Sequence, residues 1–188
     1  MKDDRLEIIC SPHTGFCFGV KRAMKLIEDG LSTPGLRIYS IGDVIHNPQA
    51  VERLKSLGVT PAASMEELSE GDTLVIRAHG VDPDIRAEAI RRGIRLIDTT
   101  CPFVRKSQEY VEEMIAGSRQ VIIIGDPRHP EVTGIAGRAG GTAIIIETLE
   151  DADGVSGIER AGVVIQTTFS REKAMEMVED LKKKIGDI

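Results

Sequence analysis

An internal repeat constrains the fold of this chain more than any other feature. A cysteine, an Ile-Gly-Asp triplet and a histidine occur in that order twice. The first set is Cys17, Ile41 to Asp43 and His46, and the second is Cys101, Ile124 to Asp126 and His129. The two cysteines are 84 residues apart, and the cysteine-to-histidine spacings are 29 and 28 residues. We therefore expect two copies of one structural unit.

The apolar residues around these motifs alternate between short runs typical of strands and longer stretches with helical spacing. The pattern predicts strands at 6–10, 36–41, 73–78, 94–97, 120–124, 143–146 and 163–166, and helices at 16–31, 48–57, 83–92, 102–114, 131–138 and 171–185. Alternating strands and helices favour α/β units with parallel sheets. We expect two pseudo-symmetric parallel-sheet α/β lobes around a central cleft, a first lobe of residues 1–98 and a second of residues 99–188.

Composition narrows the class of protein. The chain has 188 residues, of which 41% are hydrophobic and 29% charged, and its 24 Lys and Arg against 30 Asp and Glu give a net charge of −6. With no Trp and an acidic balance, binding to nucleic acid is disfavoured. No apolar run approaches the roughly 18 residues of a membrane span, and Met1 to Cys10 lacks the features of a signal peptide. We expect a cytoplasmic protein that binds neither nucleic acid nor a membrane.

The repeated residues fall where α/β proteins place their ligands. In a parallel unit, ligands collect beyond the carboxyl ends of the strands, where the next helix presents its N-terminus. The cysteines and histidines of the repeat follow predicted strands in this way, as do two further polar residues near strand ends. We expect one cleft to gather Cys17, Cys101, His46, His79, His129 and Thr167.

Cys17 and Cys101 each open a predicted helix, where the helix dipole favours the thiolate that a metal ligand or nucleophile requires. Gly15 and Gly19 flank Cys17 and leave space for a bulky group near the backbone. Three cysteines without CxxC spacing argue against a disulfide framework. An iron–sulfur cluster, which accepts thiolates from separate loops, is favoured over zinc. Cys10, inside the first predicted strand, is expected to belong to the core.

The three histidines that follow strands are expected to bind an anion such as a diphosphate, because imidazoles beside backbone amides offer hydrogen bonds. Glu131, two residues after His129, is a candidate proton donor if burial raises its pKa. The alternative for Glu131 is an ordinary acid in the first turn of a helix. His13 has no counterpart in the second unit, and we expect a loop role for it.

Six motifs in order give the chain a family resemblance: Gly15 to Val20 (GFCFGV), His46-Asn47, Arg77 to Val81 (RAHGV), Thr100 to Pro102 (TCP), His129 to Val132 (HPEV) and Gln166 to Thr168 (QTT). From about Leu6 to Ile188 the chain closely resembles the LytB-type 4-hydroxy-3-methylbut-2-enyl diphosphate reductases. That family reduces an allylic alcohol diphosphate to isopentenyl and dimethylallyl diphosphates, with loss of water, in the non-mevalonate isoprenoid pathway. It folds as three similar α/β lobes around an iron–sulfur cluster.

The resemblance implies a cofactor and an electron donor. Cys17 and Cys101 correspond to two of the three cysteine ligands of a [4Fe–4S] cluster. The reaction would take two electrons from an external donor such as ferredoxin or flavodoxin. The family's third lobe, with its cysteine ligand, is absent from these 188 residues. We therefore expect a truncated or split protein, in which a partner chain or self-association covers the flank of the missing lobe.

The resemblance also implies roles for the polar residues of the cleft. His46, His79 and His129 would face the diphosphate and the hydroxyl of the substrate. Glu131 would donate the proton, and Thr167 would orient the substrate hydroxyl and pass protons.

Two other functions remain as alternatives. A non-catalytic two-lobed module would bind a diphosphate or a metal in the same cleft without redox chemistry. A cysteine hydrolase would need one thiol paired with an imidazole and a third orienting group. The symmetric cysteines give no reason to prefer one of them as that nucleophile.

Overall fold

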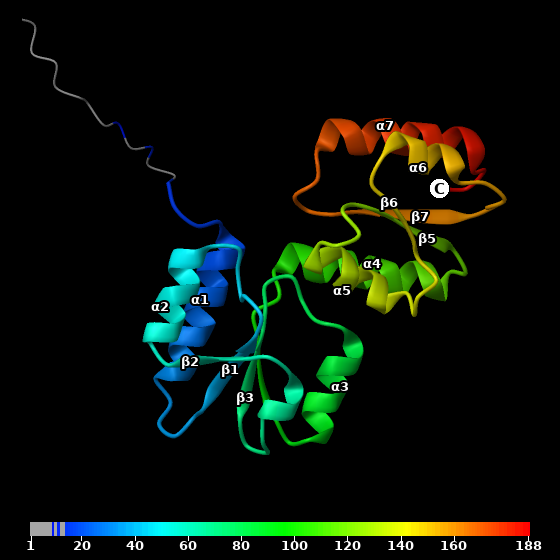
Figure 1. The fold of residues 1–188 in the computed structure, drawn as a ribbon. Helices are drawn as coiled ribbons and strands as arrows, with labels where there is room; N and C mark the ends of the chain where they lie inside the picture. The colour runs from blue at the N-terminus through cyan, green and yellow to red at the C-terminus, as the bar shows by residue number, and fades with distance from the viewer. Residues whose placement is uncertain (1–8, 10, 12–13) are drawn as a thin grey trace, which may run out of the picture.

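The computed structural model describes residues 9, 11 and 14–188, which form two lobes, each built on one sheet (Figure 1). Lobe 1 contains α1 (Phe18–Leu31), β1 (Ile38–Ile41), α2 (Pro48–Ser56), β2 (Val59–Ala62), the 3-10 helix η1 (Met65–Glu67), β3 (Thr73–Ile76), α3 (Pro83–Arg91) and β4 (Arg95–Asp98). Lobe 2 contains α4 (Pro102–Ala116), β5 (Gln120–Ile124), α5 (Pro130–Arg138), β6 (Ile144–Ile146), α6 (Leu149–Gly154), β7 (Ala161–Ile165) and α7 (Arg171–Lys184).

Both sheets are parallel, and their strand orders match. Lobe 1 has the order β2-β1-β3-β4 and lobe 2 the order β6-β5-β7. In each lobe the first strand lies at the centre and pairs in parallel with the second and third strands. The expected α/β fold of two pseudo-symmetric parallel-sheet lobes is confirmed.

The helices cover corresponding faces of the two sheets. In lobe 1, α1 and α2 pack on one face, and α3 and η1 pack on the other. In lobe 2, α4 and α5 take the places of α1 and α2, while α6 and α7 cover the opposite face. The run Val121 to Ile124 is buried throughout, because its alternate side chains contact the two helical layers in turn.

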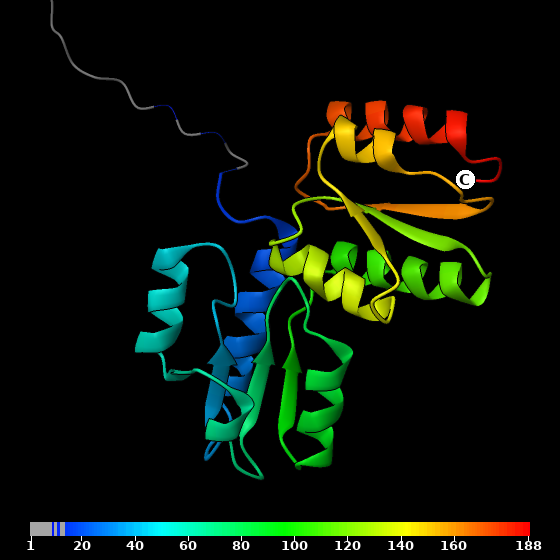
Figure 2. The same ribbon diagram turned by 45° about the vertical axis from the view of Figure 1, so that its right-hand side comes forward.

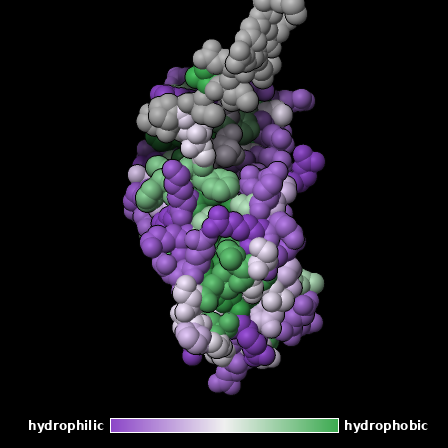
Figure 3. Space-filling view, turned by 90° about the vertical axis from the view of Figure 1, so that its left-hand side faces the viewer, coloured by the Kyte–Doolittle hydropathy of each residue, from purple (hydrophilic) through white to green (hydrophobic). Residues whose placement is uncertain are grey.

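Several predicted elements differ from the observed ones at their ends, and three short elements were not predicted. β2 is an edge strand with only its end residues buried, and Pro61 within it cannot donate a backbone hydrogen bond. Figure 3 shows this side of lobe 1, with a hydrophobic area below a belt of hydrophilic side chains. The other two elements that were not predicted are η1 and α6. Helix α6 begins with a capping box formed by Thr148 and Asp151.

The predicted strand at 6–10 lies outside the described residues except for Ile9. That residue belongs to no strand, and its side chain is 84% exposed, so the prediction is wrong at this position. The predicted core position of Cys10 and the loop role of His13 also lie outside the described residues. Among the helices that the structure describes, none has both the length and the apolar character needed to cross a membrane.

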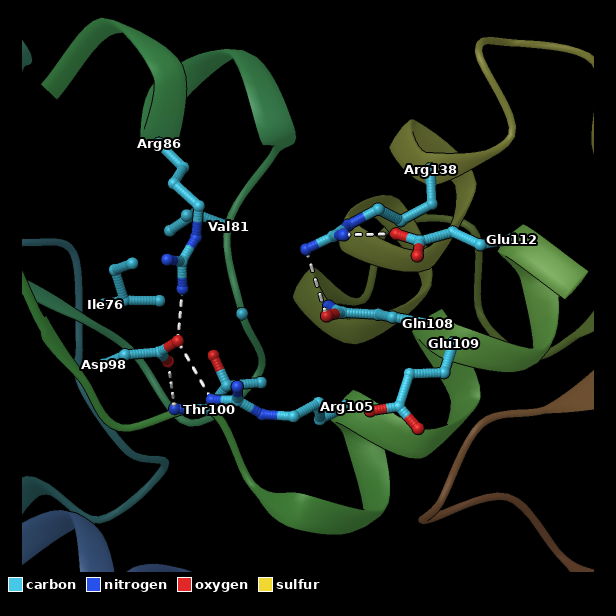
Figure 4. A pocket seen from close by; sticks show the side chains of 11 residues that line it. Ile76, Val81, Arg86, Asp98, Thr100, Arg105, Gln108, Glu109, Glu112 and Arg138 are labelled. Carbon is cyan, nitrogen blue, oxygen red and sulfur yellow. Dashed lines mark hydrogen bonds and ion pairs between the residues drawn. The ribbon is translucent and has the colours of Figure 1, made fainter. Parts of the chain in front are cut away.

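The two lobes are joined by a turn that is organised around the carboxylate of Asp98. Thr100 donates its backbone N–H to Asp98 Oδ1 over 3.0 Å. Arg105 of α4 forms an ion pair of 2.9 Å with Asp98 Oδ2, and Arg86 of α3 pairs with the same oxygen (Figure 4). One side chain therefore fixes the end of β4, the helix α3 and the first turn of α4, and with them the position of Cys101.

The charge state of Asp98 makes this turn sensitive to pH. Burial raises the pKa of Asp98, but hydrogen bonds from Thr100 and the charges of Arg105 and Arg86 outweigh it, and the pKa lies below its usual value. The native state therefore binds fewer protons at this site than the unfolded state does near pH 4. The stabilisation is present above about pH 4 and is lost as the pH falls through the native pKa.

We predict that Asp98→Asn lowers the free energy of unfolding at pH 7 by about 2 kcal/mol, since hydrogen bonds and ion pairs to a charged group are lost. At pH 3 the difference from the parent chain should be smaller than at pH 7, because the stability that the charged carboxylate contributes declines once the pH falls below the unfolded-state pKa of about 4. Urea unfolding at both pH values measures this. Asp153→Asn, which breaks an exposed ion pair with Lys184, is the control and should have little effect at either pH. Equal stability of Asp98→Asn and the parent at pH 7 would contradict the role of Asp98.

Candidate active site

Four helices begin at one cleft between the lobes. The strands of lobe 1 point toward lobe 2 (Figure 2), and the helices that follow the repeated motifs start in this region. The N-caps of α1, α2, α4 and α5 are Cys17, Asn47, Cys101 and His129. Free N–H groups and the partial positive charge of each helix N-terminus make such a region favourable for anions and thiolates.

The cleft holds a cavity of about 290 Å³ whose lining comes from both lobes. Helices α1 and α4, the loops after β1 and β3, the start of α5 and the loop after β7 all contribute. The lining residues include Cys17, Gly19, His46, Asn47, His79, Cys101, Glu131, Thr167 and Thr168. Val20, Ile45 and Val104 give the cavity an apolar wall. Of the predicted site residues, only His129 is not part of the lining, and it contacts three residues that are: His46, His79 and Glu131.

The sulfurs of both cysteines lie close to Gly19. A methyl group built on Gly19 would lie 2.8 Å from Cys101 Sγ and 3.9 Å from Cys17 Sγ. Neither cysteine side chain caps its own helix, and both thiols are free. The backbone N–H of Cys101 donates to the carbonyl oxygen of Ala78 over 2.8 Å, which ties α4 to the loop after β3. The structure thus brings the two sulfurs together at a point where only glycine leaves them room.

The three histidines form one cluster. The ring centroids of His46 and His79 lie 4.3 Å apart, and each ring lies 5.4 Å from that of His129. His79 is half-buried and its Nδ1 has no hydrogen-bond partner. Burial, and then the charges of His46, His129 and Arg77, lower the pKa of His79 to about 4. At pH 7 this ring is neutral.

One nitrogen from each histidine could meet at a single metal ion, because these atoms lie within 4.8 Å of one another. The hydrogen bond at His129 opposes this use. Its Nδ1 accepts the backbone N–H of Glu131 over 3.1 Å, so that in the neutral ring Nε2 carries the hydrogen. A nitrogen that bears a hydrogen has no lone pair for a metal and can donate to an anion. The cluster is therefore better suited to an anion than to a metal.

Glu131 and Thr167 form a hydrogen-bonded pair in which the glutamate is buried and the threonine is exposed. The side chain of Glu131, in the first turn of α5, is only 1% exposed. The N–H of Thr167 donates to Glu131 Oε1 and its hydroxyl donates to Glu131 Oε2, each over 2.8 Å. Both carboxylate oxygens are thus held by one residue of the loop after β7. This link could not be foreseen from the sequence, in which the two residues are 36 positions apart.

Gln166 is a further residue that shapes the cleft, and the sequence analysis assigned it no separate role. Its Oε1 accepts the N–H of Asp126 over 3.0 Å and its Nε2 donates to the hydroxyl of Thr168 over 2.7 Å. The amide packs so closely over Gly125 that a Cβ there would lie 2.7 Å from Oε1. Gln166 therefore locks the loop after β7 to the loop after β5. Its place at the end of a strand was the one signal in the sequence.

Comparison with known proteins relates the whole described cleft to one family. The family model described as LytB protein matches residues 8–188. The 4-hydroxy-3-methylbut-2-enyl diphosphate reductase of Aquifex aeolicus (strain VF5) is 44% identical over 180 residues, which are 94% of this chain and 62% of that protein. The protein of the same name from Geobacter sp. (strain M21) is 38% identical over 173 residues, covering 92% and 61%. The chain thus spans less than two thirds of the length of these relatives.

Two solved structures are similar to the chain with a TM-score of 0.85 each. One is of (E)-4-hydroxy-3-methyl-but-2-enyl diphosphate reductase, the terminal enzyme of the non-mevalonate pathway; it is 42% identical, and the match covers 96% of this chain and 66% of that one. The other is of the E-1-hydroxy-2-methyl-but-2-enyl-4-diphosphate reductase from Plasmodium falciparum; it is 29% identical, with 93% and 57% covered. Together with the family match over residues 8–188, this similarity shows that the chain belongs to the LytB protein family.

Proposed function

We propose that this chain provides two lobes of a 4-hydroxy-3-methylbut-2-enyl diphosphate reductase and most of its reaction cleft. The observation that carries the proposal is that two free thiols, three imidazoles and the hydrogen-bonded pair of Glu131 and Thr167 converge at one cleft where four helices begin. The proposed reaction consumes an allylic alcohol diphosphate, two electrons and two protons. It breaks the C–O bond to the hydroxyl, releases water and forms isopentenyl or dimethylallyl diphosphate.

The residues beside Gly19 fit an iron–sulfur cluster. Cys17 and Cys101 would be two of its ligands, because both thiols lie at helix N-termini that favour the thiolate, and neither is used in a hydrogen bond that caps a helix. When bound, the cluster would supply the electrons, which an external donor such as ferredoxin or flavodoxin delivers. Since the relatives are longer than this chain, the remaining cysteine ligand would come from polypeptide outside these 188 residues.

The histidine cluster would hold the diphosphate. Neutral His79 and the Nε2–H of His129 can donate hydrogen bonds, and the N-termini of α2 and α5 add backbone N–H groups and partial positive charge. His46 lies against both of the other rings and completes the set. The apolar wall of the cavity would exclude water from the carbon skeleton of the substrate.

Glu131 and Thr167 would move the proton. The hydroxyl of Thr167 donates a hydrogen bond to Glu131 Oε2. When that oxygen carries a proton, it can donate to the hydroxyl, which can then turn and donate its own hydrogen to the leaving oxygen of the substrate. The N–H of Thr167 holds Oε1 and keeps the carboxyl group in one orientation. The pair can therefore both hold a proton and place the hydroxyl that passes it on.

A non-catalytic module that binds a diphosphate or metal is the second candidate, and the three histidine nitrogens within 4.8 Å favour it. Anaerobic reconstitution with iron and sulfide separates the two functions. The reductase lobes should take up iron and sulfide at Cys17 and Cys101, and Cys17→Ser or Cys101→Ser should reduce the uptake. A colourless protein that binds zinc through its histidines would favour the module.

We predict that Glu131→Gln retains diphosphate binding and cluster uptake but lowers kcat by about 10²- to 10⁴-fold, because the amide keeps the shape of the side chain and cannot donate the proton. Steady-state assays on an assembly that contains these lobes measure the loss. Glu172→Gln, which changes an exposed acid in the first turn of α7, is the matched control and should leave the rate unchanged. A near-normal rate for Glu131→Gln would remove Glu131 from proton transfer.

We predict that Gly19→Ala reduces the iron and sulfide retained per chain, because the added methyl group would displace Cys101 Sγ from a contact of 2.8 Å. Iron and sulfide assays after anaerobic reconstitution give the measurement, and thermal unfolding shows whether the fold is kept. The control is Gly154→Ala, since a methyl group at that glycine would meet no atom within 4 Å apart from its chain neighbours and the backbone of its own helix. Full cluster uptake by folded Gly19→Ala would show that the cluster does not occupy this place.

A further inference from the structure

The two repeats differ at one position, which lies next to the cleft but does not line its cavity. Arg77 directly follows the last residue of β3, and Gln166 directly follows the last residue of β7. Both side chains lie over the glycine of the Ile-Gly-Asp turn in their own lobe. A Cβ on Gly42 would lie 3.3 Å from Arg77 Nη1, just as one on Gly125 would lie 2.7 Å from Gln166 Oε1. Arg77 is therefore the structural counterpart of Gln166.

The side chains of Gln166 and Arg77 differ in their hydrogen bonds. Gln166 satisfies both ends of its amide with hydrogen bonds inside lobe 2. Arg77 has no ion pair and no side-chain hydrogen bond within the described part of the chain, and its Nε is buried without a partner. Asp43, the acid of the adjacent turn, is exposed and forms no ion pair with it. An unpaired and half-buried guanidinium is costly, so a neutral glutamine would serve the turn better if support were its only task.

Arg77 lies on the side of the histidine cluster. Arg77 precedes His79 by two residues, and its charge is among those that lower the pKa of His79, so the guanidinium acts on the histidine cluster. Arg77 is not part of the cavity lining, whereas His79 and His46 are. Its charge can therefore act on the cleft through the intervening low-dielectric interior without direct contact with a ligand.

The cleft needs such a charge if it is to hold a diphosphate. Glu131 lines the same cavity, and whenever its carboxyl group is ionised it repels an anion. Of the three imidazoles, His79 carries no charge at pH 7, because burial and the neighbouring charges lower its pKa to about 4. They supply hydrogen bonds more readily than net charge. A guanidinium, by contrast, stays protonated at every physiological pH.

We propose that Arg77 is a positioning residue that supplies the permanent positive charge of the anion site and thereby favours a diphosphate over a monophosphate. This inference rests on the proposed function, in which the cleft holds a diphosphate. Because Coulomb attraction scales with the charge of the ligand, the loss of Arg77 should weaken diphosphate binding more than monophosphate binding.

Arg77→Gln tests the proposal most directly, since it places in lobe 1 the residue that already supports the equivalent turn of lobe 2. Isothermal titration of the 188-residue chain with inorganic diphosphate and with inorganic phosphate gives the two values of Kd. We expect about a tenfold weaker Kd for diphosphate and about a threefold weaker Kd for phosphate. Arg77→Lys should keep most of the affinity, and raised salt should narrow the gap between Arg77→Gln and the parent chain.

The control is Arg128→Gln, which removes the same charge beside His129 from a side chain that is 85% exposed and screened by water. Its two values of Kd should change little. Unchanged diphosphate binding in folded Arg77→Gln, with normal binding by the parent chain, would overturn the role of Arg77 and leave the proposed function standing. Equal losses in Arg77→Gln and Arg77→Lys would also overturn it, because charge would then not be the cause. A parent chain that binds no diphosphate would overturn both.

Discussion

The structure depends on where a parallel sheet places the ends of its strands and the beginnings of the helices that follow them. In each lobe the helices that follow the strands begin beyond the carboxyl ends of those strands, so unpaired N–H groups and partial positive charge gather there. The turn at Asp98 joins the lobes so that these ends of the two sheets meet at one cleft. Thiols, imidazoles and one carboxyl group are then placed by backbone geometry in a single cleft where four helix N-termini meet. The proposed chemistry needs that setting, since thiolates and a diphosphate are both anionic.

The two lobes share one backbone arrangement, and the residues at which they differ carry much of the proposed chemistry. Each lobe contributes one thiol at a helix N-terminus, in matching positions. Glu131 belongs to lobe 2 alone, where the loop after β7 holds it through Thr167. Arg77 belongs to lobe 1 alone, at the place that Gln166 takes in lobe 2. In the proposed reaction, the proton would therefore come from lobe 2 and the permanent positive charge from lobe 1.

The sequence was sufficient for the parts of the fold that have a strong period or a repeated motif. The run at 120–124 and the start of α4 were placed correctly, because a doubly buried strand and a helix N-cap have clear local signatures. β2 was missed because Pro61 and a lack of alternation hide an edge strand. The start of α1 was placed two residues early, because Cys17 caps the helix with extended backbone and does not belong to it.

The contacts within the cleft could not be predicted from local sequence patterns either. Its polar residues were named from their places at strand ends, but the contacts among them are tertiary. The pairing of Glu131 with Thr167 and the packing of both thiols against Gly19 join segments that no local pattern connects. Asp98 and Gln166 look like ordinary polar residues in sequence, and only the fold shows what their side chains hold.

The central claim is that the two repeats place their thiols in one cleft, and a cross-linking measurement tests it most directly. Dibromobimane becomes fluorescent when it alkylates two neighbouring thiols. In the apo chain with Cys10→Ser, the account predicts a fluorescent product that joins Cys17 to Cys101, detected as a linked peptide pair by mass spectrometry. The product should disappear when either cysteine is also changed to serine. Absence of the linked pair in folded Cys10→Ser protein, with both thiols alkylated separately, would contradict the account.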